Sequence, residues 1–183
     1  LINFLRGSGP EGLKGMLPAR DSLYIRPLLG ISRKEILSFI ESHHIPHVID
    51  ASNTESVYLR NRIRHSLIPQ LKIYNPNLEK SLNNMAEIMR REDDYMKTVA
   101  HAILSERNIV RARDEFRISI SALRTYHEAV QNQVLKELLR RIAPGGQGIG
   151  YAHIKAVVDL CFSDHPSGDL DLPHAIVVRR TYD

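Results

Sequence analysis

The sequence contains one cysteine, Cys161, and no tryptophan. A single thiol excludes a disulfide within the chain and is typical of a reducing compartment, where it usually behaves as a small apolar side chain. No apolar run approaches the roughly 20 residues that a membrane-spanning helix needs, and no charged-then-apolar signal segment occurs. These absences favour a cytoplasmic protein without a membrane partner.

Several signatures of catalysis and metal binding are also missing from the sequence. It has no Walker loop, no Gly-x-Ser-x-Gly elbow and no paired cysteines at zinc-site spacing. The glycine-rich stretch 146–150 follows a predicted helix, whereas a dinucleotide-binding loop has to follow a strand. His43 and His47 are four residues apart, but Pro46 lies between them and no carboxylate accompanies them, so we predict no metal site there.

The chain begins and ends within apolar segments, 1–5 and 176–182, and it does not start with methionine. Natural domains seldom begin and end in this way, because apolar faces would then stay unburied. We therefore expect the chain to be a fragment of a longer protein that extends at both ends.

The surplus of positive charge lies in the first half of the chain. The net charge is +4, and residues 1–92 hold 13 Lys and Arg against 9 Asp and Glu, whereas residues 93–183 hold 12 against 12. We therefore expect a polyanion to bind the first half of the chain before the second. A positive surplus of this size is also compatible with an ordinary protein surface.

The first part of the sequence has a short α/β pattern. Tyr24-Ile25 and Val48-Ile49 are predicted as strands, and Ser32-x-x-Glu35 is a capping box that begins a helix between them. Strand, helix and strand within about 30 residues indicate an α/β domain. From residue 57 the apolar residues recur every four positions until Asn75-Pro76-Asn77, where we place a domain boundary.

The second part is predicted to be helical. An amphipathic helix should cover about 78–106, and its length requires a packing partner. A short strand is expected over 116–120, a helix after the capping signal Thr125-x-x-Glu128, another helix over about 152–162 and a hairpin over 170–182. The fold class is therefore mainly α, with residues 1–74 as the edge of an α/β domain plus a connector helix and residues 75–183 as a helical domain with a short β-hairpin.

The arginines of the predicted connector helix are the most informative cluster. On a helical wheel, Arg60 and Arg64 fall within the apolar arc, whereas Arg62 falls outside it. A guanidinium on the buried side of a helix needs an anionic partner, because an unpaired buried charge is costly. This partner could be a structural carboxylate such as Asp50, in a salt bridge between domains, or the phosphate or carboxylate of a ligand.

Two loops carry weaker signals. Asp50-Ala51-Ser52-Asn53 has short polar side chains that bond nearby backbone, so by itself it indicates a turn. Arg6-Gly7-Ser8-Gly9 could wrap backbone N–H groups around an anion, and a simple helix stop explains it equally well.

Read in order, these stretches resemble tRNA(Ile)-lysidine synthetases of the PP-loop ATP pyrophosphatase superfamily. The resemblance covers nearly the whole chain, and its most specific part is Asp-x-Ser-Asn followed by Arg-Asn-x-x-Arg. The matching pieces are Leu5-Arg6-Gly7-Ser8-Gly9-Pro10 with Gly12-Leu13, Arg26-Pro27-Leu28, Asp50-x-Ser52-Asn53, Arg60-Asn61-x-x-Arg64 with Pro69, Leu172-Pro173, and Val178-x-Arg180-x-Tyr182.

The resemblance implies an ATP- and Mg²⁺-dependent ligase that modifies the wobble cytidine of tRNA(Ile) with a CAU anticodon. ATP adenylates the base, and the ε-amine of L-lysine then displaces AMP to give lysidine. Residues 1–74 would form the C-terminal edge of the PP-loop domain, and residues 75–183 would help to bind the tRNA.

The resemblance also implies roles for individual residues. Arg60 and Arg64 would be catalytic, neutralising charge on ATP or on the lysine carboxylate. The substrate-binding residues would be Arg6, Gly7, Ser8, Gly9, Asp50, Asn53 and Asn61.

The sequence departs from the family pattern in three places. The Ser-Gly-Gly-x-Asp-Ser phosphate loop and the acidic motif expected before Leu1 are absent. Pro173-His174 stands where the family usually has Pro-Gly-Gly. We therefore expect a fragment that lacks the N-terminal PP-loop, binds no ATP or Mg²⁺ by itself and is inactive.

Two other functions remain open at this point. The chain could be a helical RNA- or protein-binding module without adenylation activity, in which Arg60 and Arg64 are structural. A tRNA-thiolating PP-loop enzyme is a further alternative, but such enzymes commonly use cysteines and this chain has only Cys161. A homodimer is compatible with the sequence.

Overall fold

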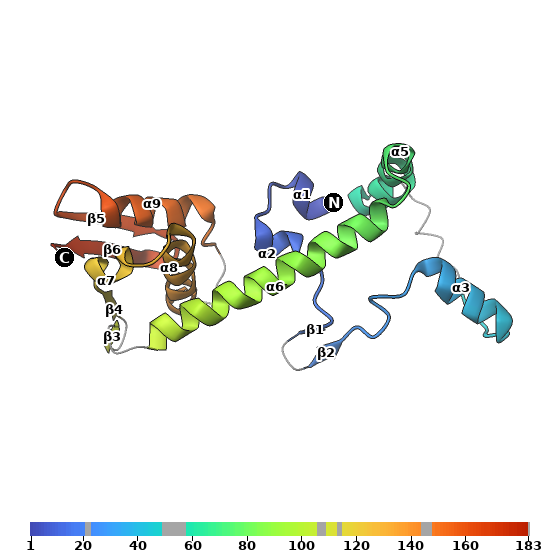
Figure 1. Ribbon diagram of the computed structural model, residues 1–183, viewed down its shortest axis with the longest axis horizontal. Coiled ribbons are helices and arrows are strands. Elements are labelled where there is room, and N and C mark those ends of the chain that lie inside the picture. The colour runs from blue at the N-terminus through green and yellow to red at the C-terminus, as the bar shows by residue number, and fades with distance from the viewer. Residues whose placement is uncertain (21–22, 49–57, 106–108, 113–114, 144–147, 183) are drawn as a thin grey trace. The chain divides into compact units, whose positions relative to one another are not determined.

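The computed structural model describes residues 1–20, 23–48, 58–105, 109–112, 115–143 and 148–182. The chain divides into two compact units, residues 1–91 and residues 92–183. The described parts are mainly helical and contain three two-stranded antiparallel sheets, which confirms the predicted fold class (Figure 1). None of the described helices combines the length and apolar character needed to cross a membrane.

The first unit opens with two short helices, α1 (Ile2–Leu5) and α2 (Pro10–Leu13). Gly7 separates them in a left-handed conformation, with φ +71°, that a residue without a side chain adopts readily. Asn3 Nδ2 donates to the carbonyl oxygen of Gly12 at 2.7 Å, which holds the two helices together.

A hairpin and a capped helix follow. β1 (Ala19–Arg20) pairs with β2 (Tyr24–Ile25), and α3 (Arg33–Ser42) begins at Ser32. The predicted capping box is confirmed, because the Ser32 side chain accepts from the Glu35 N–H at 3.2 Å and the Glu35 carboxylate accepts from the Ser32 N–H at 2.8 Å.

The prediction of a buried strand at Val48-Ile49 is wrong for Val48, and Ile49 lies outside the described residues. Val48 belongs to no strand and is 95% exposed. β-Branched residues form a strand only where a neighbouring strand pairs with them and their side chains pack against an apolar surface. The strand β2 has its partner in β1 rather than in this segment.

The connector helix is not a uniform α-helix. It runs through α4 (Leu59–Arg62), the π-helical segment η2 (Ile63–Leu67) and α5 (Ile68–Tyr74). The Ile68 N–H bonds to the carbonyl of Ile63, five residues back. Pro69, which has no N–H and would crowd the carbonyl four residues earlier, explains why the wider turn lies just before it.

α6 (Leu78–Ser105) matches the prediction of a long helix over about 78–106. At about 1.5 Å per residue it is roughly 42 Å long. Its buried residues, Ala100, Ile103 and Leu104, all lie in its last two turns. These turns pack against the buried apolar cluster of the second unit, which is the packing partner that a helix of this length needs.

The second unit packs helices against a hairpin (Figure 1). α9 contacts α8 and both strands of the β5–β6 hairpin. After α6, the elements in chain order are β3 (Ile109–Ala112), β4 (Glu115–Ile118), α7 (Ile120–Arg124), α8 (Glu128–Ile142), α9 (Tyr151–Phe162), β5 (Ser167–Leu172), η4 (Pro173–Ala175) and β6 (Ile176–Thr181).

Two local predictions for this unit need correction. The strand ends at Ile118, and Ile120 begins the short helix α7 instead, because the Ser119 side chain caps that helix by accepting from the Ala122 N–H at 3.2 Å. Thr125 does not cap α8; its hydroxyl donates to the Ala122 carbonyl at the end of α7.

The core lies in the second unit. Every residue of its buried apolar cluster lies between Ala100 and Ile176, and Leu123, Val134 and Val157 are almost completely inaccessible to solvent. In the described part of the first unit, Ile63 is the one buried apolar residue. Among the described residues, the second unit therefore has a buried apolar core of its own, whereas the first unit buries far fewer apolar side chains.

The turn of the β5–β6 hairpin keeps a backbone shape that suits glycine. His174 and Ala175 have φ +66° and +57°, in the left-handed region. These two residues occupy the position where the resembling family usually has Gly-Gly. The departure in sequence therefore leaves two side chains in a conformation that costs about 1–2 kcal/mol per residue.

Candidate functional site

The predicted burial of Arg60 and Arg64 is wrong. Arg60, Arg62 and Arg64 are all exposed, and Ile63 between them is buried at 7% exposure. Leu59, which defined the apolar arc, is itself 45% exposed, so the arc is not covered at α4. The π-helical turn Ile63–Leu67 takes up one residue more than an α-turn, so the apolar residues at and beyond its end, Leu67 and Leu71, are out of phase with a uniform wheel.

The structure does not support a salt-bridge lock within the described residues. No hydrogen bond or ion pair joins the guanidinium of Arg60 or Arg64 to another described residue, so both remain available to an external anion. Asp50 and Asn53 were predicted to position this helix, and both lie outside the described residues. Asn61, on the same helix, is half-buried.

The loop Arg6–Gly9 is a helix stop. The N–H groups of Gly7 and Ser8 donate to the carbonyls of Phe4 and Asn3, each at 2.9 Å, so they are already used within the protein. The Gly9 residue caps α2 ahead of Pro10. An anion cradle built from these amides is therefore not present, whereas the Arg6 side chain is exposed.

The acidic and histidine side chains do not form a metal site in the parts of the chain that the structure describes. No group of three His, Cys, Asp or Glu residues is arranged to hold a metal ion there. We therefore assign none of the described carboxylates to the Mg²⁺ that the resemblance implies.

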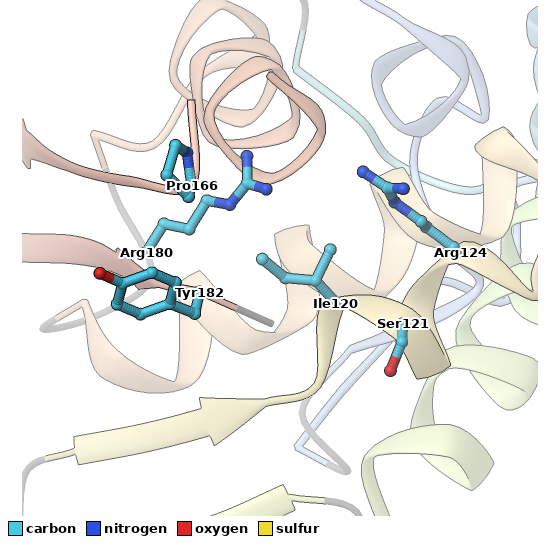
Figure 2. Close-up of a pocket in the computed structure, with 6 residues that line it drawn as sticks. All are labelled: Ile120, Ser121, Arg124, Pro166, Arg180 and Tyr182. Carbon is cyan, nitrogen blue, oxygen red and sulfur yellow. The ribbon is translucent and has the colours of Figure 1, made fainter. Parts of the chain in front are cut away.

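A second candidate site lies in the second unit, apart from the residues predicted to be catalytic or substrate-binding. A pocket of about 340 Å³ lies between α7 and the end of the β5–β6 hairpin (Figure 2). None of its lining residues is acidic. The residues that line it are Ile120, Ser121, Arg124, Pro166, Arg180 and Tyr182.

Arg180 is anchored by one of its three nitrogens. Its Nη1 donates to the carbonyl oxygens of Leu160 and Ser163 at 3.1 and 2.8 Å, and to Ser163 Oγ at 3.1 Å. Its Nε is buried and has no hydrogen-bond partner among the described residues. An unsatisfied buried donor on a charged group costs free energy.

Arg124 faces the same pocket from α7. Its guanidinium carbon lies 5.5 Å from the centre of the Phe162 ring, a cation–π contact that orients the side chain. Figure 2 shows the guanidinium groups of Arg124 and Arg180 on either side of Ile120. Tyr182, at the edge of the pocket, is 75% exposed.

The neighbouring Arg179 is engaged elsewhere. It makes a two-pronged bond with Asp169 across the hairpin, with Nε to Oδ1 and Nη2 to Oδ2 both at 2.9 Å. This hydrogen-bonded pairing lowers the pKa of the Asp169 carboxyl below its ordinary value. The side chains of Arg179 and Arg180, which are consecutive on β6, therefore lie on opposite faces of the hairpin.

The sequence held a partial signal for this pocket. Arg180 and Tyr182 belong to the quoted stretch Val178-x-Arg180-x-Tyr182, but the residue types alone did not suggest a site. Arg124 is 56 positions before Arg180, and no local pattern links the two. Folding brings them together.

Comparison with known proteins gives two family matches in order along the chain. Residues 1–71 match the model of the PP-loop domain, and residues 118–183 match the model of the TilS substrate binding domain. The first match shows that the PP-loop domain is present in this chain, which corrects the expectation of a fragment that lacks the N-terminal PP-loop. What the sequence does lack is the Ser-Gly-Gly-x-Asp-Ser motif.

Curated relatives match the whole chain. It is 30% identical to the tRNA(Ile)-lysidine synthase of Caldanaerobacter subterraneus subsp. tengcongensis, over 100% of this chain and 38% of that protein. It is also 30% identical to the tRNA(Ile)-lysidine synthase of Geobacter sulfurreducens, covering 39% of that protein, and 29% identical to the bifunctional protein TilS/HprT of Listeria monocytogenes, covering 29%. The chain thus spans about two fifths of the length of the first two relatives.

Proposed function

We propose that this chain belongs to the tRNA(Ile)-lysidine synthase family and forms part of an enzyme that ligates lysine to the wobble cytidine of tRNA(Ile), using ATP. The observation that carries the proposal is the order of the matches. A PP-loop domain match and a TilS substrate binding domain match follow one another on a chain that is similar throughout to enzymes of that name.

The exposed apolar side chains of the first unit support the view that it is one part of a larger domain. Tyr24, Ile25 and Phe39 are 57%, 78% and 56% exposed, and Ile63 is the one buried apolar residue among those described in this unit. An independent domain normally buries such residues in a core of its own.

The exposed arginines support an anionic ligand on the connector helix. We assign Arg60 and Arg64 to neutralising charge on the phosphates of ATP or on the carboxylate of L-lysine. Arg6 and Asn61 would border the same site, while Asp50 and Asn53 keep their proposed positioning role. Mg²⁺ would bind together with the phosphates of ATP.

The proposal includes three finer points. The substrate is tRNA(Ile) with a CAU anticodon, and the compartment is the cytoplasm, where that substrate is found. The 183 residues do not adenylate RNA by themselves, because the phosphate loop motif is absent from the sequence. A homodimer is compatible with the proposal, which does not depend on it.

The test is lysine incorporation. The full-length protein that contains this chain is mixed with ATP, Mg²⁺, radiolabelled lysine and tRNA(Ile) transcript, and the 183-residue chain is assayed beside it. We expect label in the tRNA with the full-length protein and none with the chain alone. Binding of tRNA without incorporation by the full-length protein would instead support an RNA-binding module, and incorporation by the chain alone would refute its incompleteness.

A further inference from the structure

The pocket between α7 and the β5–β6 hairpin has the chemistry of an anion site. Two guanidiniums, Arg124 and Arg180, line it without an acidic residue among the other lining side chains. Like charges that share one pocket repel each other, so an anion between them is favoured. Neither arginine has an ion pair with a described carboxylate.

The free donors determine which anion fits. Nη1 of Arg180 is committed to the end of α9, whereas its Nη2 makes no hydrogen bond with a described residue. The Arg124 side chain contacts the Phe162 ring and makes no hydrogen bond or ion pair with a described residue. Two guanidiniums that line one pocket suit the tetrahedral oxygens of a phosphate.

An aromatic side chain lies beside the two cations. Tyr182 lines the same pocket and is 75% exposed, while its backbone N–H donates to the Pro166 carbonyl at 2.9 Å. A fixed backbone with an exposed ring provides a surface on which a base can stack. Cations next to an exposed aromatic ring favour a nucleic acid over an acidic protein segment.

We infer that this pocket binds a backbone phosphate of an RNA through Arg124 and Arg180, with Tyr182 stacking on an adjacent nucleotide. The inference rests on the proposed function in one respect, namely that the RNA is the tRNA substrate. A contact to phosphate positions the RNA but does not read its sequence. The pocket should therefore contribute equally to binding of tRNA(Ile) and of a tRNA of unrelated sequence.

The test measures tRNA binding by the 183-residue chain, using fluorescence anisotropy at several salt concentrations. Arg124→Gln should weaken binding of both tRNAs about tenfold and lower the slope of log K against log salt by about one. The matched control is Arg141→Gln, which removes an equal charge from an exposed position outside the pocket and should change affinity less than about twofold. Thermal unfolding of each variant checks that the fold is retained.

The stacking role has its own pair of variants. Tyr182→Ala should weaken binding about tenfold, whereas Tyr182→Phe, which keeps the ring, should bind like the unaltered chain. Inorganic phosphate and poly-glutamate serve as competitors that carry the charge without a base. If poly-glutamate competes as well as tRNA and Tyr182→Ala has no effect, the occupant is an acidic polypeptide and the inference is refuted.

The outcomes separate this inference from the proposed function. If Arg124→Gln and Arg141→Gln weaken binding equally, or if the unaltered chain binds no tRNA, the phosphate site is refuted whether or not the full-length protein incorporates lysine. If binding depends on Arg124 and Tyr182 but the full-length protein incorporates no lysine, the pocket stands and the ligase proposal fails.

Discussion

The guanidinium of Arg180 donates to the carbonyl oxygen of Ser163 at 2.8 Å, just beyond the C-terminal end of α9. The last carbonyls of a helix have no partner within it, and a charged donor satisfies them well. Gly168, which faces Arg180 in the register of the hairpin, lets α9 approach, because a Cβ there would lie 3.0 Å from a Leu160 methyl group. The hairpin and the helix are thus fastened at one place, which also forms a wall of the pocket.

Replacing Arg180 should therefore reduce stability. Arg180→Met keeps the apolar stem but removes three hydrogen bonds to the end of α9. We expect a loss of about 2 kcal/mol in the free energy of unfolding, since hydrogen bonds from charged groups contribute about 1.5–3 kcal/mol. Urea denaturation measures it, with the exposed Arg141→Met as the control; equal stability of the two variants would contradict the anchoring role.

Ala175→Gly in the hairpin turn should stabilise the protein. Ala175 has φ +57°, and glycine adopts this conformation without the clash of a Cβ atom. We expect a gain of about 0.5–1 kcal/mol in the free energy of unfolding, measured by thermal or urea denaturation. Ala102→Gly, at an exposed position within α6, should instead cost about 1 kcal/mol. A loss of stability in Ala175→Gly would show that the turn is not strained.

The Asp169–Arg179 pair should make a small contribution to acid stability. Hydrogen bonding to Arg179 lowers the pKa of Asp169 in the folded state, so the pair stabilises the fold above the unfolded-state pKa of the carboxyl. That contribution is lost as the pH falls through the folded-state pKa. An NMR titration of the Asp169 side-chain carboxyl should show the lowered pKa, and Arg179→Gln should return it to the ordinary range; an unchanged value would exclude the pairing in solution.

The connector-helix arginines provide the test of the proposed site. In the full-length protein, Arg60→Ala or Arg64→Ala should lower kcat/KM for lysine incorporation by at least about 100-fold, whereas Arg62→Ala should lower it far less. All three side chains are exposed, so each replacement should change the free energy of unfolding by less than about 0.5 kcal/mol. Equal loss of activity in all three variants would contradict the assignment.

Local signals in the sequence predicted much of the fold. The capping box Ser32-x-x-Glu35 and the long helix of residues 78–105 were predictable, because capping and amphipathic periodicity involve residues within a few positions of one another. The β5–β6 hairpin was predictable for the same reason. The start of α7 at Ile120 was not, because the alternating pattern over residues 116–120 cannot show that Ser119 will cap a helix.

A helical wheel could not predict whether the side chains of Arg60 and Arg64 are buried or exposed. A wheel assumes one uniform helix and a covered apolar arc, and the connector helix has neither, given the π-helical turn before Pro69 and the exposure of Leu59. The sequence could select Arg60 and Arg64 through the Arg-Asn-x-x-Arg pattern. Whether these side chains are buried depends on which other segments pack against the helix, and that could not be predicted from the helix alone.

By itself, then, the sequence determined the capped helix α3, the long helix α6, the β5–β6 hairpin and the ordered motifs, since these depend on neighbouring residues and on residue identity. Tertiary structure alone decided that the core lies between Ala100 and Ile176, and that Arg124 and Arg180 line one pocket. The physical reason is distance along the chain. Burial and convergent charge arise from contacts between segments far apart in sequence, and no local pattern encodes which of those segments will meet.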